Sequence, residues 1–148
     1  MLAARRGHTD CLKNLLNRNA DPEIRSSNGF TPLIYAANFF QHECVSILLE
    51  NGANLNSATN THVIHEPSGC MTALHYAAYK NDTKIVQILL RAGANTSLEA
   101  SNGWTARNFA KKDVKKYFDT STKAYSDMMK GIAECTILRY FNFVFMMN

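Results

Sequence analysis

A period of 33 residues constrains this chain more than any other feature of its sequence. A Leu-Leu pair at 15–16 returns at 48–49, 33 positions later, and again at 89–90, 41 positions later. Ala-Ala pairs keep the same intervals, at 3–4, 36–37 and 77–78. Eight extra residues between Ser57 and Thr72 account for the longer second interval. A repeat of this length predicts a stack of similar structural units, each packed against the next.

The second unit shows the local structure that is expected of every unit. Gly29 permits a turn, and Thr31 is expected to cap a helix that begins at Pro32. This first helix should end near Phe40. A second helix is expected over residues 41–51, where apolar residues recur at helical spacing and a glycine follows.

Several motifs in fixed register resemble the ankyrin repeat. They are Gly-Phe-Thr-Pro-Leu at 29–33, Gly-Ala-Asn-Leu-Asn at 52–56, Thr-Ala-Leu-His-Tyr-Ala-Ala at 72–78 and Gly-Ala-Asn at 93–95, together with the paired alanines and leucines. The resemblance covers residues 2–118. It implies an all-α ankyrin-repeat solenoid of stacked helix-turn-helix units with projecting β-turn loops, in which His75 braces the neighbouring turn.

The repeats predict the organisation of the chain. We expect a truncated first unit at 1–25, a second at 26–58, a third with a loop insertion at 59–99, a shortened C-terminal unit at 100–118 and a non-repeat apolar tail at 119–148. The first unit lacks its turn, so either the chain is a fragment of a longer array, which we favour, or it is weakly ordered before Thr9.

The shortened unit is expected to cap the stack. Its second helix should end at residues 117–118 and present Lys111, Lys112, Lys115 and Lys116 as a polar outer face. The alternatives for this lysine run are a nuclear-import patch and a docking site for acidic partners. For the tail, the alternatives are an extra helix on the open end of the stack, docking to a membrane surface or a partner, and a non-native chain end; we expect it to be covered or non-native.

Composition and charge narrow the classes of partner. Apolar residues make up 46% of the chain, enough for a continuous core. The net charge is +4, but residues 1–99 contain eight basic and eight acidic side chains, which argues against a nucleic-acid-binding surface. No run of 18 apolar residues is present, so no membrane span is expected.

The cysteines and histidines predict neither disulfides nor a metal site. Cys11, Cys44, Cys70 and Cys135 lie far apart and form no CxxC pair, so we expect a reducing compartment, the cytoplasm or the nucleus. Cys11 and Cys44 occupy equivalent repeat positions and should be buried thiols. His62, His65 and Cys70 in the insertion do not match zinc-finger spacing, so no metal and no cofactor is expected.

The resemblance implies that partner contacts come from the projecting turns and the concave side of the first helices. Carried over position by position, these are Arg25, Ser27, Asn28, Phe30, Asn38 and Phe39 in the second unit, Ser68, Gly69, Met71, Tyr79 and Lys80 in the third, Glu99, Ser101, Asn102 and Trp104 in the fourth, and Arg5 and Arg6 in the first. Phe30, Met71 and Trp104 share one turn position. They are interpreted either as an apolar row of binding anchors or as side chains that pack against the adjacent turn.

No catalytic motif is present, so the sequence favours a non-enzymatic protein–protein interaction module, an intracellular scaffold or adaptor, expected to be a monomer. One alternative is a regulatory ankyrin array of a larger channel or enzyme. Another is a substrate of an asparagine hydroxylase, because Asn56 lies eight residues after Leu48 in a setting similar to hydroxylated ankyrin asparagines.

Overall fold

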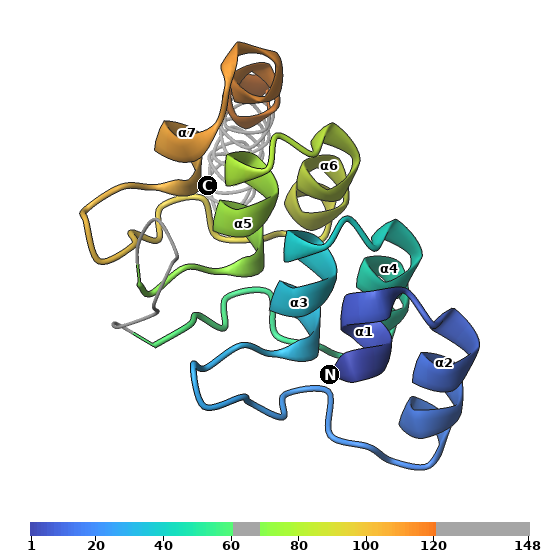
Figure 1. Ribbon diagram of the computed structural model, residues 1–148. Helices are drawn as coiled ribbons and strands as arrows, with labels where there is room; N and C mark the ends of the chain where they lie inside the picture. The colour runs from blue at the N-terminus through green and yellow to red at the C-terminus, as the bar shows by residue number, and fades with distance from the viewer. Residues whose placement is uncertain (61–68, 121–148) are drawn as a thin grey trace, which may run out of the picture.

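The chain folds into stacked pairs of antiparallel helices, as the repeat period predicts (Figure 1). The structure is a computed structural model, and it describes residues 1–60 and 69–120. Its helices are α1 (Leu2–Arg6), α2 (Thr9–Asn17), α3 (Pro32–Asn38), α4 (His42–Glu50), α5 (Ala73–Tyr79), α6 (Thr83–Arg91) and α7 (Ala106–Phe109), followed by a helical segment over residues 112–120. Within these ranges the extended structure is limited to two isolated bridges, Ala58 with Thr72 and Glu99 with Thr105.

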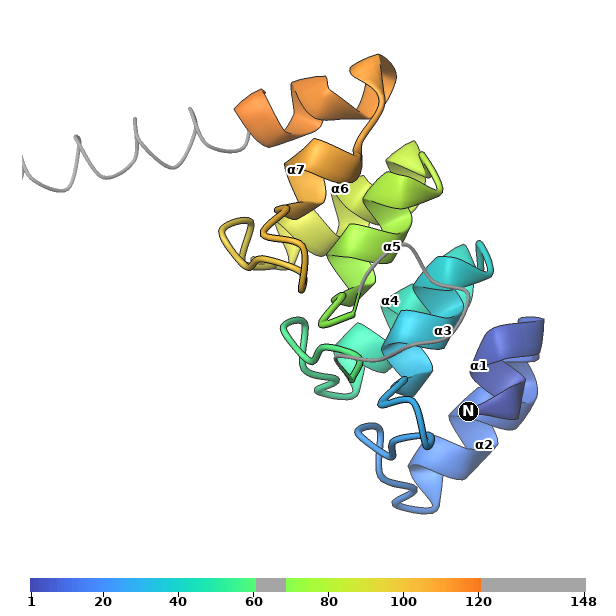
Figure 2. The same ribbon diagram turned by 60° about the vertical axis from the view of Figure 1, so that its left-hand side comes forward.

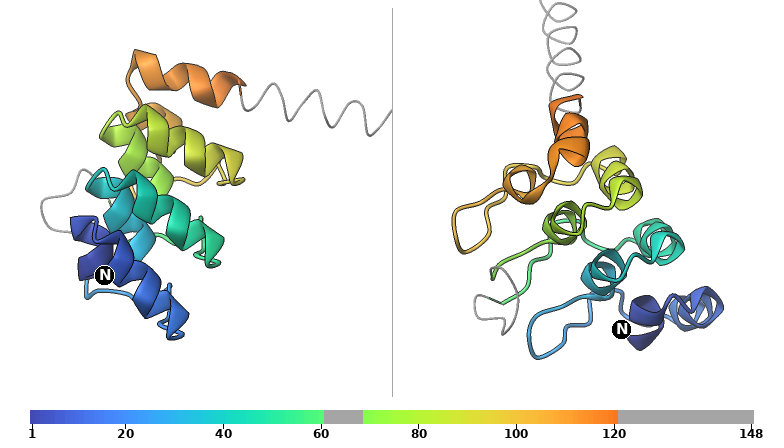
Figure 3. Two further views of the ribbon diagram at one scale, coloured as in Figure 1. Left: turned by 90° about the vertical axis from the view of Figure 1, so that its right-hand side faces the viewer. Right: turned by 45° about the horizontal axis from the view of Figure 1, so that its top comes forward.

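The helices form two parallel rows. The first helices of the units, α1, α3, α5 and α7, contact one another in sequence, and the second helices α2, α4 and α6 form the other row. We call these the inner and outer helices. The turns that join successive units project on the side of the inner helices, as the right-hand view of Figure 3 and the turned view in Figure 2 show. The all-α solenoid with projecting turns is therefore confirmed.

Local chemistry explains where the inner helices begin. The Thr31 hydroxyl accepts a hydrogen bond from the Ile34 amide at 3.3 Å, and Pro32 occupies the first helical position. In the third unit, Thr72 and His75 form a reciprocal capping box at the start of α5. The predicted bounds of the second unit, a helix from Pro32 ending near Phe40 and a second helix over 41–51, agree with α3 and α4 within a few residues.

Small residues allow the inner helices to pack closely. Ala36 and Ala37 on α3 and Ala77 and Ala78 on α5 are fully buried, and leucines of the outer helices close the core behind them. Each repeated alanine or leucine pair thus contributes to contacts within its own unit and with the next. This explains why these pairs carry the period most clearly.

The final helical segment reaches residue 120, within a few residues of the expected end at 117–118, and Val114 and Phe118 are buried. One prediction about an individual residue is wrong. Cys44 is buried as predicted, but Cys11 is exposed. The reason is that α4 lies between α2 and α6, whereas α2 has an outer-helix neighbour on one side, so the equivalent positions are covered differently.

The connection between the helices of a unit requires a left-handed residue. Gly7, Phe40 and Asn81 occupy equivalent positions and have φ values of 75°, 61° and 59°. Glycine and asparagine adopt this conformation readily, whereas a phenylalanine does so at a cost in free energy. Phe40 is nevertheless placed there with its side chain exposed.

Among the described residues, no helix has the length and apolar character needed to cross a membrane. Across residues 1–60 and 69–120, no three His, Cys, Asp or Glu side chains gather closely enough to hold a metal ion. His62, His65, Ser68, Cys135 and the tail beyond residue 120 lie outside the described residues.

Candidate protein-binding face

Aromatic side chains gather along the inner helices and their adjoining turns in two clusters, each partly buried and partly exposed. The first cluster consists of Phe30, Tyr35 and Phe39. The ring of Tyr35 stacks on Phe30 at 4.9 Å between centroids and lies 6.4 Å from Phe39. Phe30 also contacts Tyr76 of the next inner helix at 5.4 Å, so the cluster is anchored in the core and reaches the surface at Phe39, which is 37% exposed.

The second cluster consists of Tyr79, Trp104 and Phe109. Phe109 of α7 is its centre, with its ring edge-on to Trp104 at 5.2 Å and to Tyr79 at 6.4 Å. Tyr79 and Trp104 are 43% and 50% exposed. This half-covered aromatic surface has the composition from which protein interfaces commonly draw their anchor residues.

A cation lies over an exposed ring in each cluster. The Arg5 guanidinium is 4.7 Å from the centroid of Phe39, and the Lys80 ammonium is 5.6 Å from the centroid of Tyr79. Beside the first cluster, Met1, Leu2, Arg5 and Tyr35 line an open hollow of about 280 Å³. The face therefore combines apolar rings, a hollow and positive charge, which is suited to binding a protein segment rather than to catalysis.

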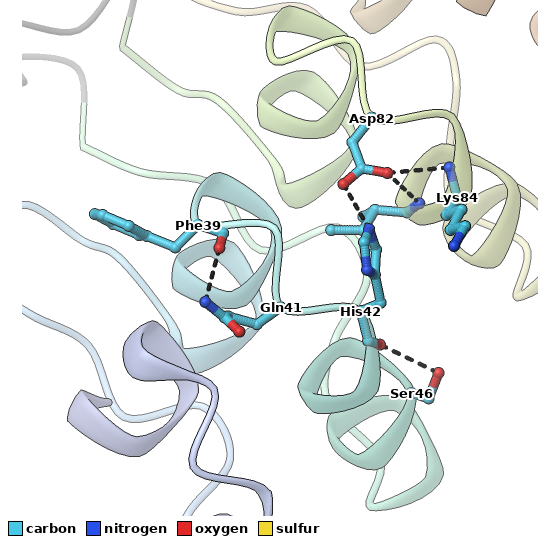
Figure 4. Close-up of polar contacts among 7 residues, drawn as sticks. Phe39, Gln41, His42, Ser46, Asp82 and Lys84 are labelled. Atoms are coloured by element: carbon cyan, nitrogen blue, oxygen red, sulfur yellow. Dashed lines mark hydrogen bonds and ion pairs between the residues drawn. The ribbon is translucent and has the colours of Figure 1, made fainter.

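The loop that presents the first cluster is held by side-chain hydrogen bonds (Figure 4). The side-chain amide of Gln41 donates from Nε2 to the Phe39 carbonyl at 2.8 Å, next to the left-handed residue Phe40. Nearby, His42 Nε2 lies 2.8 Å from the Asp82 carboxylate, whose other oxygen caps α6 by accepting from the Lys84 and Ile85 amides. These bonds tie the second unit to the third and fix the direction in which Phe39 points.

The burial of Phe30, Met71 and Trp104 distinguishes between the two interpretations of these turn residues. Phe30 and Met71 are 5% and 0% exposed, so the packing interpretation holds for them and the exposed apolar row is wrong at these two positions. For Phe30 the reason is that the inner helix of the next unit covers the turn, because Tyr76 contacts the Phe30 ring. In the described part of the chain no inner helix of a following unit lies against Trp104, which stays half-exposed.

The other residues predicted to contact a partner either lie exposed on the surface or form hydrogen bonds with the next turn, and some do both. Arg25 donates from Nη1 to the Ala58 carbonyl at 2.9 Å, and the carbonyls of Ser27 and Asn28 accept from the side chain and the amide of Asn60. These three residues therefore hold the second turn against the third. Exposed residues among the predictions are Arg5, Arg6, Arg25, Ser27, Asn28, Phe39, Tyr79, Lys80, Glu99, Ser101, Asn102 and Trp104, whereas Asn38 is half-buried and Gly69 is buried.

His75 braces the neighbouring turn, as predicted. Its Nδ1 accepts from the Thr72 amide at 3.2 Å, and its Nε2 donates to the Trp104 carbonyl at 3.3 Å. Burial lowers the pKa of His75 below its ordinary value, although hydrogen bonds to the backbone of Trp104 and Leu98 act in the opposite direction. Protonation would place a second donor opposite the Thr72 amide, so the neutral ring is the structural form.

Asn56 lies on the exposed surface of the turn after α4. Its side-chain oxygen accepts from the Asn95 amide at 3.1 Å and so joins two successive units. Glu23 has the equivalent position one unit earlier and accepts from the Asn54 amide at 2.9 Å. Bracing the next turn is thus the structural role of Asn56, and its modification stays a prediction.

Sequence reasoning missed Tyr35 and Phe109 as parts of this face, and it missed the left-handed, exposed Phe40 in the adjoining loop. A signal was available, because Leu2, Tyr35, Tyr76 and Phe109 recur at the same intervals as the alanine pairs. For Phe40 the signal was a large apolar residue where the equivalent positions carry Gly7 and Asn81.

The fold defines a helical-repeat protein, and the aromatic clusters on its inner side are the candidate binding face. Family models described as ankyrin repeats (3 copies) and ankyrin repeats (many copies) match residues 1–59 and 33–90. The chain therefore belongs to the ankyrin-repeat family. Proteins of this family are generally protein–protein interaction modules, and their repeats are generally not catalytic.

Relatives of the chain are much longer proteins. An ankyrin repeat protein of fowlpox virus is 36% identical over 109 residues, covering 71% of this chain and 29% of its own length. Ankyrin repeat and SOCS box protein 3 of Homo sapiens is 37% identical over 101 residues, covering 66% of this chain and 18% of its own length. The Caenorhabditis elegans homolog of transient receptor potential cation channel subfamily A member 1 is 32% identical over 121 residues, covering 79% of this chain and 9% of its own length. The chain thus spans less than a third of each of these relatives.

Proposed function

We propose that this chain is a scaffold or adaptor module of the cytoplasm or nucleus that holds one partner protein on its inner helices and turns. The observation that carries the proposal is the pair of aromatic clusters. Phe39, Tyr79 and Trp104 each expose more than a third of their surface on one side of the stack. Large exposed aromatic rings cost solvation free energy in a free protein, and a partner that covers them recovers it.

The positions of the exposed rings support one continuous contact. Phe39 follows α3, Tyr79 ends α5 and Trp104 precedes α7, so the three rings lie on or beside three successive inner helices that contact one another. Extended concave surfaces of this kind are what repeat proteins use for binding. A partner segment that runs along the inner row would meet both clusters.

A second candidate is a regulatory array within a longer protein. The similarity to a transient receptor potential channel homolog, of which this chain covers 9%, favours it. In that case the aromatic clusters would bind another part of the same polypeptide. The binding face is the same in both proposals, and the partner differs.

The experiment is an affinity pull-down from cell lysate with the intact chain and a variant carrying Phe39→Ala, Tyr79→Ala and Trp104→Ala. Leu15→Ala is the matched control, because Leu15 is a similarly exposed apolar residue on the outer helix α2. We expect a protein retained by the intact chain and by the control to be released by the triple variant, with all three chains showing the same helical content. Equal retention by all three would contradict the proposal.

A further inference from the structure

Charge on the stack is separated by helix row, although residues 1–99 are neutral overall. The inner helices contain Arg5, Arg6 and Arg107 and no acidic residue. Among α1 to α7 the acidic residues lie in the outer row, at Asp10, Glu43 and Glu50, and the final helical segment over residues 112–120 adds Asp113 and Asp119. The neutral sum therefore conceals a positive inner row and a mixed outer one.

The positive charges that border the aromatic clusters are available to a ligand. Among the described residues, neither Arg5 nor Lys80 forms an ion pair, and each is held over an exposed ring. Arg107, in contrast, donates to Asp119 at 2.9 Å. Asp82, the carboxylate next to Lys80 in sequence, is 8% exposed and bonded to His42 and to the start of α6. It is directed away from solvent and does not neutralise the face.

We propose that the partner segment is acidic, with Asp or Glu side chains interspersed with apolar or aromatic ones. This inference rests on the proposed function and specifies the chemistry of its partner. Apolar side chains would pack on Phe39 and on the second cluster, while carboxylates would reach Arg5 and Lys80 at the edges of the same rings. A partner that covers the rings also removes water from the neighbouring cations, which strengthens their attraction to a carboxylate.

A single-stranded nucleic acid is the competing polyanion, because stacked bases and phosphates also match rings and cations. The face carries few free cations for this role. Binding along a phosphate backbone draws on several lysine or arginine contacts, whereas the cations held beside the exposed rings are Arg5 and Lys80, at separate clusters. An acidic peptide can place its carboxylates where the cations are and apolar side chains elsewhere, so the structure favours the peptide.

The test is selection of binders from a random 16-residue peptide library displayed on phage, with the full chain as bait. A charge-reversal bait carries Arg5→Glu and Lys80→Glu. Its matched control carries Lys13→Glu and Lys84→Glu, which make the same change in net charge at exposed lysines of the outer helices α2 and α6. Selected peptides are then synthesised, and their affinities for all three baits are measured at low and high salt.

We expect the selected pool to be rich in Asp and Glu together with Leu, Phe or Trp. Its members should bind the charge-reversal bait at least about tenfold more weakly, bind the control within about twofold of the intact chain, and lose affinity as salt rises. A pool without excess negative charge whose members still lose affinity for the variant carrying Phe39→Ala, Tyr79→Ala and Trp104→Ala would overturn the acidic partner and leave the proposed function standing. A failure to select any peptide would contradict both. Tighter binding of a thymidine 16-mer at the same face would replace the acidic peptide with a nucleic acid.

Discussion

Replacing one turn residue in two different units should have very different costs, because the same repeat position is buried in one unit and exposed in the other. Phe30 is 5% exposed and its ring contacts Tyr35 and Tyr76, whereas Trp104 is 50% exposed and contacts Phe109. Truncating a buried phenylalanine costs about 3–5 kcal/mol, from lost burial and the cavity that remains. Trp104→Ala should cost about 1–2 kcal/mol of stability, because this half-exposed side chain loses only about half of a buried ring's hydrophobic contribution, together with one aromatic pair.

The assay is urea unfolding of the full chain followed by far-ultraviolet circular dichroism. Natural domains are stable by about 5–15 kcal/mol, so Phe30→Ala should remove a large fraction of the free energy of unfolding while Trp104→Ala leaves most of it. Met71→Ala serves as an internal check, because a fully buried methionine should cost about 2–5 kcal/mol. If Trp104→Ala cost as much as Phe30→Ala, the assignment of one residue to the core and the other to the binding face would be refuted.

Three further predictions concern the loops and the charged groups. Phe40→Asn should raise the free energy of unfolding by about 1 kcal/mol, because asparagine accepts the left-handed conformation that Asn81 adopts at the equivalent position; a lower midpoint in urea would contradict this. The free energy of unfolding should fall as the pH drops below about 6.5, because His75 takes up a proton more readily in the unfolded chain than when it is buried in the folded one. Thermal melts of the chain and of His75→Gln at several pH values measure this dependence. An equal slope of stability with pH in both proteins would show that other groups are responsible. Glu99→Gln should tighten the binding of selected acidic peptides about two- to fivefold by removing a repulsive carboxylate; unchanged or weaker affinity in fluorescence anisotropy would place the peptide away from that turn.

The fold could be predicted from sequence because the same residue types recur at equivalent positions of each unit. Thr31 and Pro32 indicate the start of a helix, and the alanine pairs indicate where two helices meet. Only contacts between neighbouring units are needed to build the stack, so local motifs and their spacing are sufficient. The error lies at Cys11, whose surroundings on α2 differ from those of Cys44 in the central unit.

The site was predicted in part, because the period identifies equivalent positions but not what covers them. Phe30 and Trp104 are indistinguishable by register, and the burial of Phe30 comes from Tyr76, which belongs to the next unit. The charge distribution was missed for a similar reason, since the neutral net charge of residues 1–99 conceals the separation of charge between the inner and outer helix rows. Both properties depend on which helix row a side chain joins, and this becomes visible when the units are stacked.

Protein binding at the inner-helix face can be tested by site-specific photo-crosslinking. A benzophenone amino acid replaces the exposed residue Tyr79 in one version of the full chain and the exposed outer residue Lys84 in another. If the partner lies on the inner helices, position 79 yields a crosslinked protein in cells that is lost when Phe39→Ala and Trp104→Ala are added, and position 84 yields no such product. A product from position 84 without one from position 79 would show that the partner binds elsewhere.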